Sequence, residues 1–395
     1  MNMNYAIFGN GTLGKWVRNA IDKNAPDYKL ICMADNNPDL HGIEPDGTPV
    51  VSAKELSVLY KNGDIDTIIV AVQVRWVYIN PLLKQLNSLG ITEVYILPQY
   101  YYDYLGDNIS ITDSLIAIPT EKPCINRNLN IVLNRHCNLN CQGCGMFANL
   151  YNEPCFSDFS QYKKDLLRLK ELFSQARYIG LFGGEPLLNK ELPDYIKLCR
   201  ELFPAASIYV ETNGILLLSC EDSLFETMRD NNVCILITPY VISKNNEIAI
   251  KERCNQFNVC YVYRGDNVDD LDFRSSFYKM LDSSGKHTDI VKSYNDCINR
   301  GSSNNWHVYN GYMSSCLFPL YVNKYNETFG ETFKVEPADT INIYNKDLDG
   351  WTLSDYLQSP KPFCRYCAYR NERKFFDWSR TTEAKTSDWL VNEEN

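Results

Sequence analysis

Short apolar runs alternate with stretches of helical periodicity over the first hundred residues. Four of these runs predict buried strands, at residues 5–8, 30–34, 66–72 and 93–97. The first run leads into a helical pattern that continues to Ile21. Strands that alternate with helices are typical of a parallel, doubly wound α/β sheet. We therefore predict a first domain over residues 1–105, followed by a linker over residues 106–127.

The same alternation resumes over residues 128–290. Five further strands are predicted, at residues 130–133, 178–182, 207–211, 233–238 and 259–263. Between the first two, apolar residues recur at spacings of three and four over residues 159–173, which indicates a helix. These repeated βα units predict a second α/β domain that is closer to a partial barrel than to an open sheet.

The alternation is lost in the third block, residues 291–395. This block is rich in Asn, Ser, Tyr and Cys, and its pattern predicts irregular structure. A long irregular region inside a folded protein needs something other than regular hydrogen-bond ladders to hold it. Metal ions bound by side chains are one way to hold such a region together.

Composition narrows the class of protein. The 395 residues carry 39 basic and 49 acidic side chains, a net charge of −10, which argues against a nucleic-acid-binding protein. No run approaches 18 apolar residues, so we predict no membrane span, and the first residues lack the positive charge of a secretory signal. Fifteen cysteines without such a signal favour metal ligation or redox chemistry in a reducing cytoplasm.

Three cysteines stand close together directly after the predicted strand at residues 130–133. Cys137, Cys141 and Cys144 are separated by three and by two residues, so their thiolates can converge. Thiolate clusters select zinc or iron–sulfur. Zinc would require a fourth ligand to complete a tetrahedron, whereas three cysteines suit a 4Fe–4S cluster with one open iron. Structural thiols without a metal are the remaining alternative.

Two further motifs follow the next strands in order: Gly183-Gly184-Glu185-Pro186, then Thr212-Asn213-Gly214. Together with the C-x3-C-x2-C spacing, they resemble the radical S-adenosylmethionine (SAM) superfamily. The resemblance implies a partial (β/α)6 barrel and an enzyme that uses a reduced 4Fe–4S cluster to cleave SAM into a 5′-deoxyadenosyl radical. It also implies an external reductant such as flavodoxin or ferredoxin.

The resemblance assigns residues to this chemistry. It implies that Cys137, Cys141 and Cys144 bind three irons, and that SAM chelates the fourth. The SAM-binding residues would be Gly183, Gly184, Glu185 and Asn213. One position departs from the family pattern: many members carry an aromatic residue before the last cysteine, close to the adenine, where this chain has Gly143. We expect Phe147 to cover the adenine instead.

Four cysteines lie in the third block: Cys297, Cys316, Cys364 and Cys367. Their spacing resembles the SPASM or shorter twitch extension of radical SAM enzymes. This implies one auxiliary 4Fe–4S cluster, fully bound by four thiolates, within residues 291–395. A structural zinc held by the same thiolates is the alternative, because spacing alone does not distinguish the two.

The first domain carries a glycine fingerprint. Gly9, Gly11 and Gly14 lie in the pattern G-x-G-x-x-G between a predicted strand and helix, and Asp35 ends the next strand. This is the arrangement of a Rossmann-like fold, in which a helix N-terminus binds phosphate and the carboxylate binds a ribose. We predict a nucleotide site, for NAD(P) or a nucleotide-sugar. A vestigial or docking domain is the alternative.

The phrases at residues 136–141, 181–188 and 376–379 resemble those of radical SAM proteins found beside cell-envelope polysaccharide genes. We therefore predict a radical SAM enzyme, of oxidoreductase or isomerase/lyase type, that abstracts hydrogen from a sugar, nucleotide-sugar or polyol. The outcome would be oxidation, epimerisation or elimination. One alternative is a SPASM-type maturase that modifies a ribosomal peptide or protein. A second is a non-catalytic nucleotide-binding scaffold with structural metal.

Overall fold

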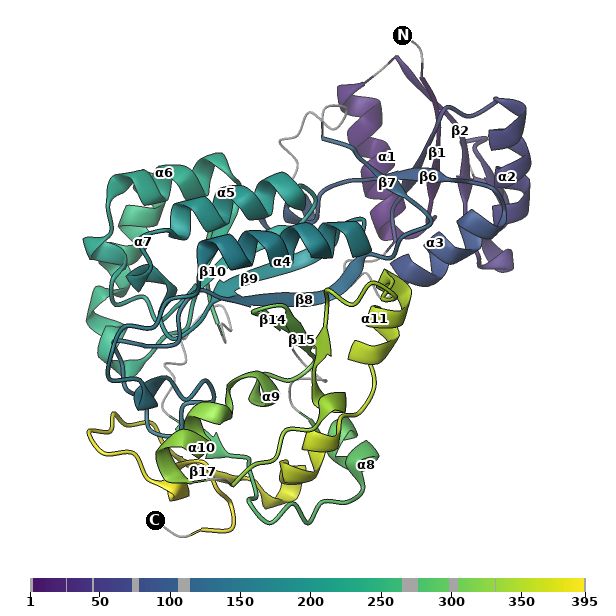
Figure 1. The fold of residues 1–395 in the computed structure, drawn as a ribbon. Coiled ribbons are helices and arrows are strands. Elements are labelled where there is room, and N and C mark those ends of the chain that lie inside the picture. The colour runs from purple at the N-terminus through teal and green to yellow at the C-terminus, as the bar shows by residue number, and fades with distance from the viewer. Residues whose placement is uncertain are drawn as a thin grey trace. The chain divides into compact units, whose positions relative to one another are not determined.

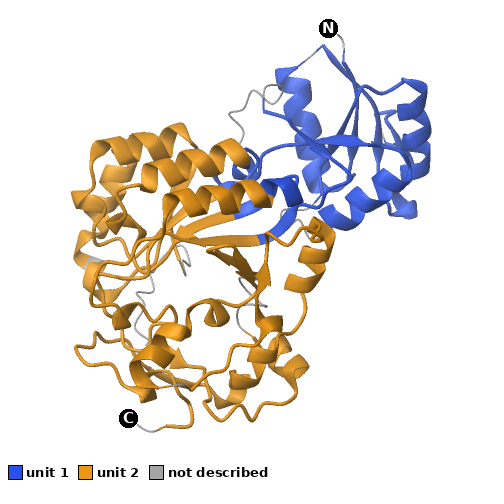
Figure 2. Ribbon diagram, viewed as in Figure 1, with its two compact units in different colours: residues 1–127, 170–178, 203–207 blue, residues 128–169, 179–202, 208–395 orange. Residues whose placement is uncertain are grey.

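The computed structural model describes residues 3–25, 27–44, 46–72, 78–105, 114–264, 276–297, 305–330 and 332–393. The chain divides into two compact units, shown in blue and orange in Figure 2. The first unit holds residues 1–127, 170–178 and 203–207, and the second holds residues 128–169, 179–202 and 208–395. Each unit is organised around its own sheet.

The first unit contains a seven-stranded sheet in the order β3-β4-β2-β1-β5-β6-β7 (Figure 1). Its strands are β1 (Met3–Phe8), β2 (Tyr28–Ala34), β3 (Gly42–Ile43), β4 (Pro49–Val51), β5 (Thr67–Val70), β6 (Glu93–Ile96) and β7 (Ile116–Pro119). The central strand β1 pairs in parallel with β2 and with β5, whereas the end strands β3 and β7 are antiparallel. The predicted parallel α/β core is therefore confirmed, and β7 lies within the stretch predicted as a linker, whose residues 106–113 are outside the described chain.

The helices of this unit are α1 (Thr12–Asn24), α2 (Ala53–Asn62) and α3 (Ile79–Ser88). A π-helical turn, η2, follows β6 at Tyr101–Leu105. Ser52 begins α2 with a capping box, because its hydroxyl accepts from the Glu55 backbone while the Glu55 carboxylate accepts from the Ser52 backbone. The central strand is enclosed on both faces: residues 5–7 have no exposed surface. Such a strand reads as a continuous apolar run in the sequence.

The larger sheet has eight strands in the order β12-β11-β10-β9-β8-β14-β15-β16. They are β8 (Ile125–Val132), β9 (Ala176–Phe182), β10 (Ser207–Thr212), β11 (Val233–Ile237), β12 (Tyr261–Tyr263), β14 (Asn305–Tyr309), β15 (Tyr312–Ser314) and β16 (Ile341–Asn342). Strand β11 pairs in parallel with β10 and with β12, and β14 pairs in parallel with β8. Among the described residues no pairing joins β12 to β16, so the strands form an open row.

Four helices connect the consecutive strands of this row: α4 (Phe159–Leu172), α5 (Leu192–Leu202), α6 (Asp222–Asp230) and α7 (Glu247–Gln256). Figure 1 shows α4, α5 and α6 on one face of the strands. This order of strands and helices places the end of each parallel strand at a common edge, where β8, β9 and β10 lead into the loops that carry the sequence motifs. No helix of the described residues is long and apolar enough to cross a membrane.

The third block has more regular structure than its pattern predicts. Asn310 and Gly311 both adopt left-handed backbone, with φ of 48° and 80°, and turn β14 into the antiparallel strand β15. Strand β15 also pairs antiparallel with β16, and β17 (Lys374–Asp377) pairs antiparallel with β13 (Ser276–Lys279), which precedes this block. The helices here are short: α8 (Ile290–Asn295), α9 (Phe318–Tyr321), α10 (Asn323–Phe329) and α11 (Gly350–Leu357). The Asn-Gly turn is a recognised hairpin signal that the sequence analysis did not use.

Candidate functional site

The loop that carries Cys137, Cys141 and Cys144 begins where β8 ends. The three thiols lie near one another: burial first, and then the neighbouring Cys144, Glu185 and Cys141, raise the pKa of Cys137 to about 12. Among the described residues, no three His, Cys, Asp or Glu side chains converge as ligands of one metal ion. Ligands of a single metal ion must converge on one point. In an iron–sulfur cluster each thiolate binds a different iron, so the thiolates stand farther apart. Three thiols on one loop are a donor set that fits such a cluster.

The glycine pair after β9 lies directly against this loop. The backbone N–H of Gly184 donates to the carbonyl of Asn134 at 2.9 Å, and that of Glu185 donates to the carbonyl of His136 at 3.2 Å. A Cβ atom on Gly183 would stand 2.3 Å from the Asn134 oxygen, and one on Gly184 would stand 1.9 Å from the His136 oxygen. The close backbone approach that these glycines allow is therefore to the cysteine loop itself. Their predicted contact with SAM stays a prediction.

Glu185 joins the ends of β9 and β10. Its carboxylate is fully buried and accepts three hydrogen bonds: from the Thr212 hydroxyl at 2.7 Å, the Asn213 backbone at 2.9 Å and the Leu187 backbone at 3.1 Å. Burial raises the pKa of Glu185 to about 7, although these bonds oppose the rise. This carboxylate was predicted to bind SAM, and in the structure three protein donors already bind it.

Asn213 extends the connection from β10 to the cysteines. Its amide nitrogen donates to the Asn138 side chain at 2.8 Å and lies 3.9 Å from the Cys137 sulfur. Its side-chain oxygen accepts from the Ile215 backbone at 3.0 Å, which fixes the orientation of the amide. The three sequence motifs, which follow β8, β9 and β10, therefore meet through direct hydrogen bonds.

A segment that the sequence analysis did not place at this site covers the cysteine loop. This covering segment comprises residues 376–389. The Trp378 indole donates to the Cys141 sulfur at 3.1 Å, and the Trp389 indole donates to the Cys144 carbonyl at 2.8 Å. The backbone adds two bonds between the segments, from Gln142 to Ser379 and from Thr381 to Asn140, both at 2.9 Å. Only long-range folding brings these residues together, so the phrase at residues 376–379 gave no indication of their position.

The prediction that Phe147 covers an adenine is wrong. Phe147 is fully buried, and its ring packs at 5.6–5.9 Å from the rings of Phe318, Tyr325 and Trp389. The space beside Gly143 is instead occupied by Phe376, whose ring lies 2.9 Å from where a Gly143 Cβ would stand. Gly143 also has a left-handed φ of 63°, which favours glycine there.

The four cysteines of the third block also gather. Burial first, and then the nearby Cys367, Cys297 and Cys364, raise the pKa of Cys316 well above its usual value. Cys364 lies on the short helix η9 (Pro362–Tyr366), and the backbone N–H of Cys367 donates to its carbonyl at 3.1 Å. Four thiols near one another fit the donor set of an iron–sulfur cluster, whereas a zinc ion would need them to converge more closely than any three ligand side chains do in the described residues.

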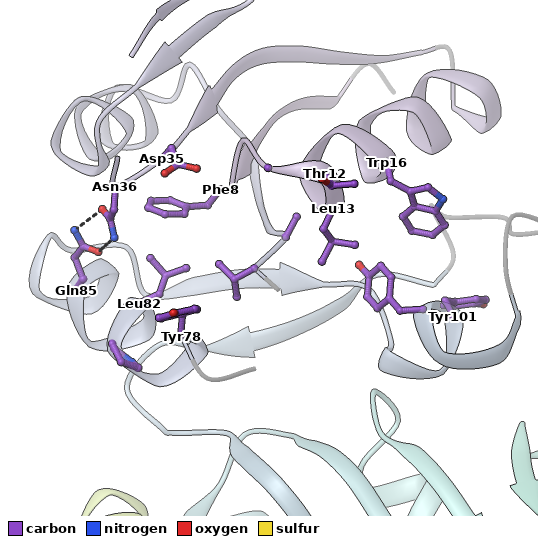
Figure 3. A pocket seen from close by; sticks show the side chains of 16 residues that line it. Phe8, Thr12, Leu13, Trp16, Asp35, Asn36, Tyr78, Leu82, Gln85 and Tyr101 are labelled. Atoms are coloured by element: carbon purple, nitrogen blue, oxygen red, sulfur yellow. Dashed lines mark hydrogen bonds between the residues drawn. The ribbon is translucent and has the colours of Figure 1, made fainter. Parts of the chain in front are cut away.

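The first unit contains a cavity of about 980 Å³ at the ends of β1, β2 and β5, where the strand order changes direction (Figure 3). Gly9, Gly11 and Asp35 are among the residues that line it. A Cβ on Gly14 would meet the Gly9 oxygen at 1.7 Å, so this glycine allows helix and loop to pack closely. Gly11 has no atom within 4 Å of such a Cβ, and no side chain caps the first N–H groups of α1. This end of α1 is therefore open to an anion.

Asp35 is held at the edge of the same cavity. Its two carboxylate oxygens accept from the backbone of Asn10 at 2.8 Å and of Asn37 at 2.9 Å. Beside it, Asn36 and Gln85 exchange two amide hydrogen bonds of 2.8 and 2.9 Å, drawn as dashed lines in Figure 3. The predicted residues Gly9, Gly11 and Asp35 thus share one cavity, and the ligand of that cavity stays a prediction.

Residues 131–262, which include the three cysteines and both following motifs, match the family model of the radical SAM superfamily. This stretch is a radical SAM domain. The superfamily implies a 4Fe–4S cluster and SAM as cofactors. The chain is 33% identical over 88 residues to a 7,8-dihydro-6-hydroxymethylpterin dimethyltransferase of Methanocaldococcus jannaschii, and 28% identical over 148 residues to molybdenum cofactor biosynthesis protein 1 of Dictyostelium discoideum.

These matches are partial. They span 17% of the methyltransferase and 22% of the molybdenum cofactor protein, and 22% and 35% of this chain. Among solved structures, the chain is similar to BtrN in complex with AdoMet and 2-DOIA, with 20% identity and a TM-score of 0.37 over 61% of this chain and 92% of that one. It is also similar to anSMEcpe with bound AdoMet, with 16% identity and a TM-score of 0.30 over 36% and 42% of the two chains.

Proposed function

We propose that this chain is an enzyme that cleaves SAM reductively and abstracts hydrogen from a sugar, nucleotide-sugar or polyol, in cell-envelope glycan biosynthesis. The observation that carries the proposal is the set of hydrogen bonds that joins the cysteine loop to the ends of β9 and β10, through Gly184, Glu185 and Asn213. These bonds hold three thiols and both motifs of a radical SAM domain at one edge of the sheet.

Cys137, Cys141 and Cys144 would hold the cluster of this domain. When bound, the cluster supplies the electron that splits SAM into methionine and a 5′-deoxyadenosyl radical. The chain's own residues fix the loop: Asn213 donates to Asn138 beside Cys137, and the Trp378 indole donates to Cys141. The covering segment also shields the loop, since Cys141 is only 7% exposed. Shielding from water limits side reactions of a radical.

The cavity of the first unit supports a substrate that carries a nucleotide. The open N-terminus of α1 suits a diphosphate, and the Asp35 carboxylate suits a ribose diol. A nucleotide bound there is tethered through the chain to the radical SAM domain, which raises the local concentration of an attached sugar. NAD(P) would bind to the same N-terminus of α1 and the same Asp35 carboxylate.

The grouped thiols of Cys297, Cys316, Cys364 and Cys367 support an auxiliary 4Fe–4S cluster. Four protein thiolates leave no iron open, so the cluster would act as an electron acceptor and not as a substrate ligand. An acceptor for the second electron favours oxidation of the substrate radical. With zinc in its place, epimerisation or elimination becomes the expected outcome.

Anaerobic reconstitution, followed by iron and sulfide analysis and by a SAM cleavage assay, tests the proposal. About eight irons per chain with 5′-deoxyadenosine formation are expected. Cys141→Ala should abolish cleavage, whereas Cys220→Ala, a partly exposed cysteine outside both groups, should retain it. About four irons and one zinc would preserve the radical chemistry and remove the auxiliary cluster. A chain that binds no iron, or binds it without cleaving SAM, would overturn the enzymatic proposal.

A substrate screen separates the proposed substrate from a peptide. Nucleotide-sugars, free sugars and polyols should raise the rate of 5′-deoxyadenosine formation above that with SAM alone. Stimulation by peptides, with none by any sugar, would replace the sugar proposal with a peptide-modifying enzyme.

A further inference from the structure

Arg135 follows β8, two residues before the first cysteine, and is surrounded by tyrosines. Its guanidinium carbon lies 5.2, 5.1 and 4.9 Å from the ring centres of Tyr151, Tyr309 and Tyr321. The three rings come from the loop after the cysteines, from β14 and from α9, and Tyr321 is fully buried. The backbone N–H of Arg135 donates to the Cys155 carbonyl at 2.8 Å, which fixes the start of the side chain. We call these four residues the arginine–tyrosine cage.

No carboxylate neutralises this arginine within the described part of the chain. Its Nε atom is enclosed and has no hydrogen-bond partner there, and no ion pair to its guanidinium occurs among the same residues. Aromatic faces attract a cation, but they leave the planar N–H donors of the guanidinium unsatisfied. The enclosed Nε–H is a buried donor without an acceptor, which is costly, so it calls for a hydrogen-bond partner.

Other polar atoms around the cage also lack partners. The Tyr321 hydroxyl is enclosed without a hydrogen bond, and so are both side-chain atoms of Asn149, two residues before Tyr151. Lys324 places its ammonium 5.1 Å from the Tyr151 ring and pairs with Glu327 at 3.7 Å. With Arg135 added, these charged groups leave one net positive charge beside the cage.

Two rings of the cage pack in a cluster that also contacts both cysteine groups of the second unit. Tyr309 and Tyr321 belong to one packed cluster of side chains that also contains Cys137 and Cys144 of the loop, and Cys316 and Cys367 of the third block. Arg135 itself is partly exposed, so a ligand has access to it.

We propose that the arginine–tyrosine cage binds an oxyanion of the substrate, a carboxylate or a phosphate ester, through paired hydrogen bonds from the Arg135 guanidinium. This inference rests on the proposed function and narrows its substrate class from sugars in general to anionic ones. A planar guanidinium matches either oxyanion with two parallel bonds, and the aromatic walls strengthen the attraction by excluding water. The Tyr321 hydroxyl supplies a further donor or acceptor.

Equilibrium binding to the reconstituted full-length protein tests the inference, with glucose, glucuronate and glucose 6-phosphate as probes. One of the charged sugars should bind at least tenfold more tightly than glucose. Preference for glucuronate identifies a carboxylate, and preference for glucose 6-phosphate identifies a phosphate ester. Arg135→Gln should abolish this difference in affinity. Arg135→Lys should retain part of it, because lysine keeps the positive charge but lacks the paired N–H donors of a guanidinium.

Two further variants keep the test interpretable. Arg229→Gln removes the same charge from an exposed arginine paired with Asp230 and should leave the preference intact. Tyr321→Phe keeps the ring and removes only the hydroxyl, so it should weaken binding of the charged sugar several-fold even if Arg135→Gln fails to fold.

Equal binding of charged and neutral sugars, or a preference that survives in Arg135→Gln, would overturn the inference. SAM cleavage by the wild-type protein separates this failure from that of the proposed function. If cleavage occurs without an anion preference, only the cage assignment fails. If the wild type cleaves no SAM, the enzymatic proposal fails whatever the cage binds.

Discussion

Both sheets of this protein carry glycines at the carboxyl end of a strand, but the two sets serve different purposes. Around Gly11 the structure is open, with no atom within 4 Å of an added Cβ and a cavity of about 980 Å³ beside it. At Gly184 an added Cβ would lie 1.9 Å from the backbone oxygen of His136. The first glycine leaves room for a ligand, and the second lets two protein loops touch. The same residue type at the same topological position therefore gives no information on ligand contact until its neighbours are known.

The largest effect is expected at the glycine that faces backbone. Gly184→Ala should lower the free energy of unfolding by about 2–4 kcal/mol, because a carbonyl oxygen cannot move aside as a flexible side chain can. It should also prevent iron binding by the loop. Gly145→Ala, in the cysteine loop that Gly184 touches, is the matched control, since nothing lies within 4 Å of its added Cβ. Denaturant unfolding and iron analysis measure both, and equal behaviour of the two variants would contradict the comparison.

The open glycine should behave in the opposite way. Gly11→Ala should change the free energy of unfolding by less than about 1 kcal/mol. It should nevertheless weaken nucleotide binding by about 2 kcal/mol, roughly 30-fold, because the methyl group enters the space that a phosphate would occupy. Calorimetric titration with NAD⁺ and with a UDP-sugar measures the affinity. If Gly11→Ala binds a nucleotide as tightly as the wild type does, the glycine motif does not contact that nucleotide.

The two sheets also differ in acid sensitivity, because a fully buried histidine lies in the larger one. Burial lowers the pKa of His307 on β14 to about 3, from about 6.5 in an unfolded chain. Since the folded pKa is the lower one, the unfolded state binds more protons between these values. Stability should therefore be complete above pH 6.5 and fall by about 1.5 kcal/mol between pH 6.5 and 5.

His307→Leu should flatten this part of the stability profile. His41→Gln, at an exposed histidine of the first unit, is the matched control for the loss of an imidazole. Denaturant unfolding between pH 5 and 7.5 measures the slopes, and an unaltered slope in His307→Leu would show that another group titrates.

The smallest effect concerns the covering segment, which bonds only the cysteine loop. In the described chain, no comparable segment bonds the loop of Gly9, Gly11 and Gly14 in the first unit. Trp378→Phe removes an N–H donor from the Cys141 sulfur and should lower the midpoint potential of the reconstituted cluster by roughly 20–60 mV. Trp389→Phe removes a bond to a carbonyl oxygen instead, so its shift should be smaller. A redox titration followed by paramagnetic resonance measures both, and identical shifts would assign the effect to packing.

Local patterns in the sequence encode part of the fold and part of the site. Apolar runs marked the parallel strands, because strands buried on both faces need continuous apolar sequence. The motifs after β8, β9 and β10 lie together, since neighbouring parallel strands end at one edge. The fingerprint and Asp35 share a cavity for the same reason.

Features that depend on distant partners were missed. The covering segment and the arginine–tyrosine cage pair residues far apart in the chain, and neither has a periodicity of its own. Phe147 was expected to replace the aromatic residue that is missing at Gly143, whereas its ring packs against Phe318, Tyr325 and Trp389, which are distant in sequence. The β14–β15 hairpin, by contrast, carried a local turn signal that was overlooked.

The covering segment has a consequence for the order of events during synthesis. The bond between Trp378 and Cys141 joins residues 237 positions apart. At about 5–20 residues per second, the ribosome completes the cysteine loop roughly 10–50 s before the tryptophan that covers it. During that interval the thiols are open on one side. Iron and sulfide delivered to the growing chain in this interval would reach Cys141 before Trp378 covers it.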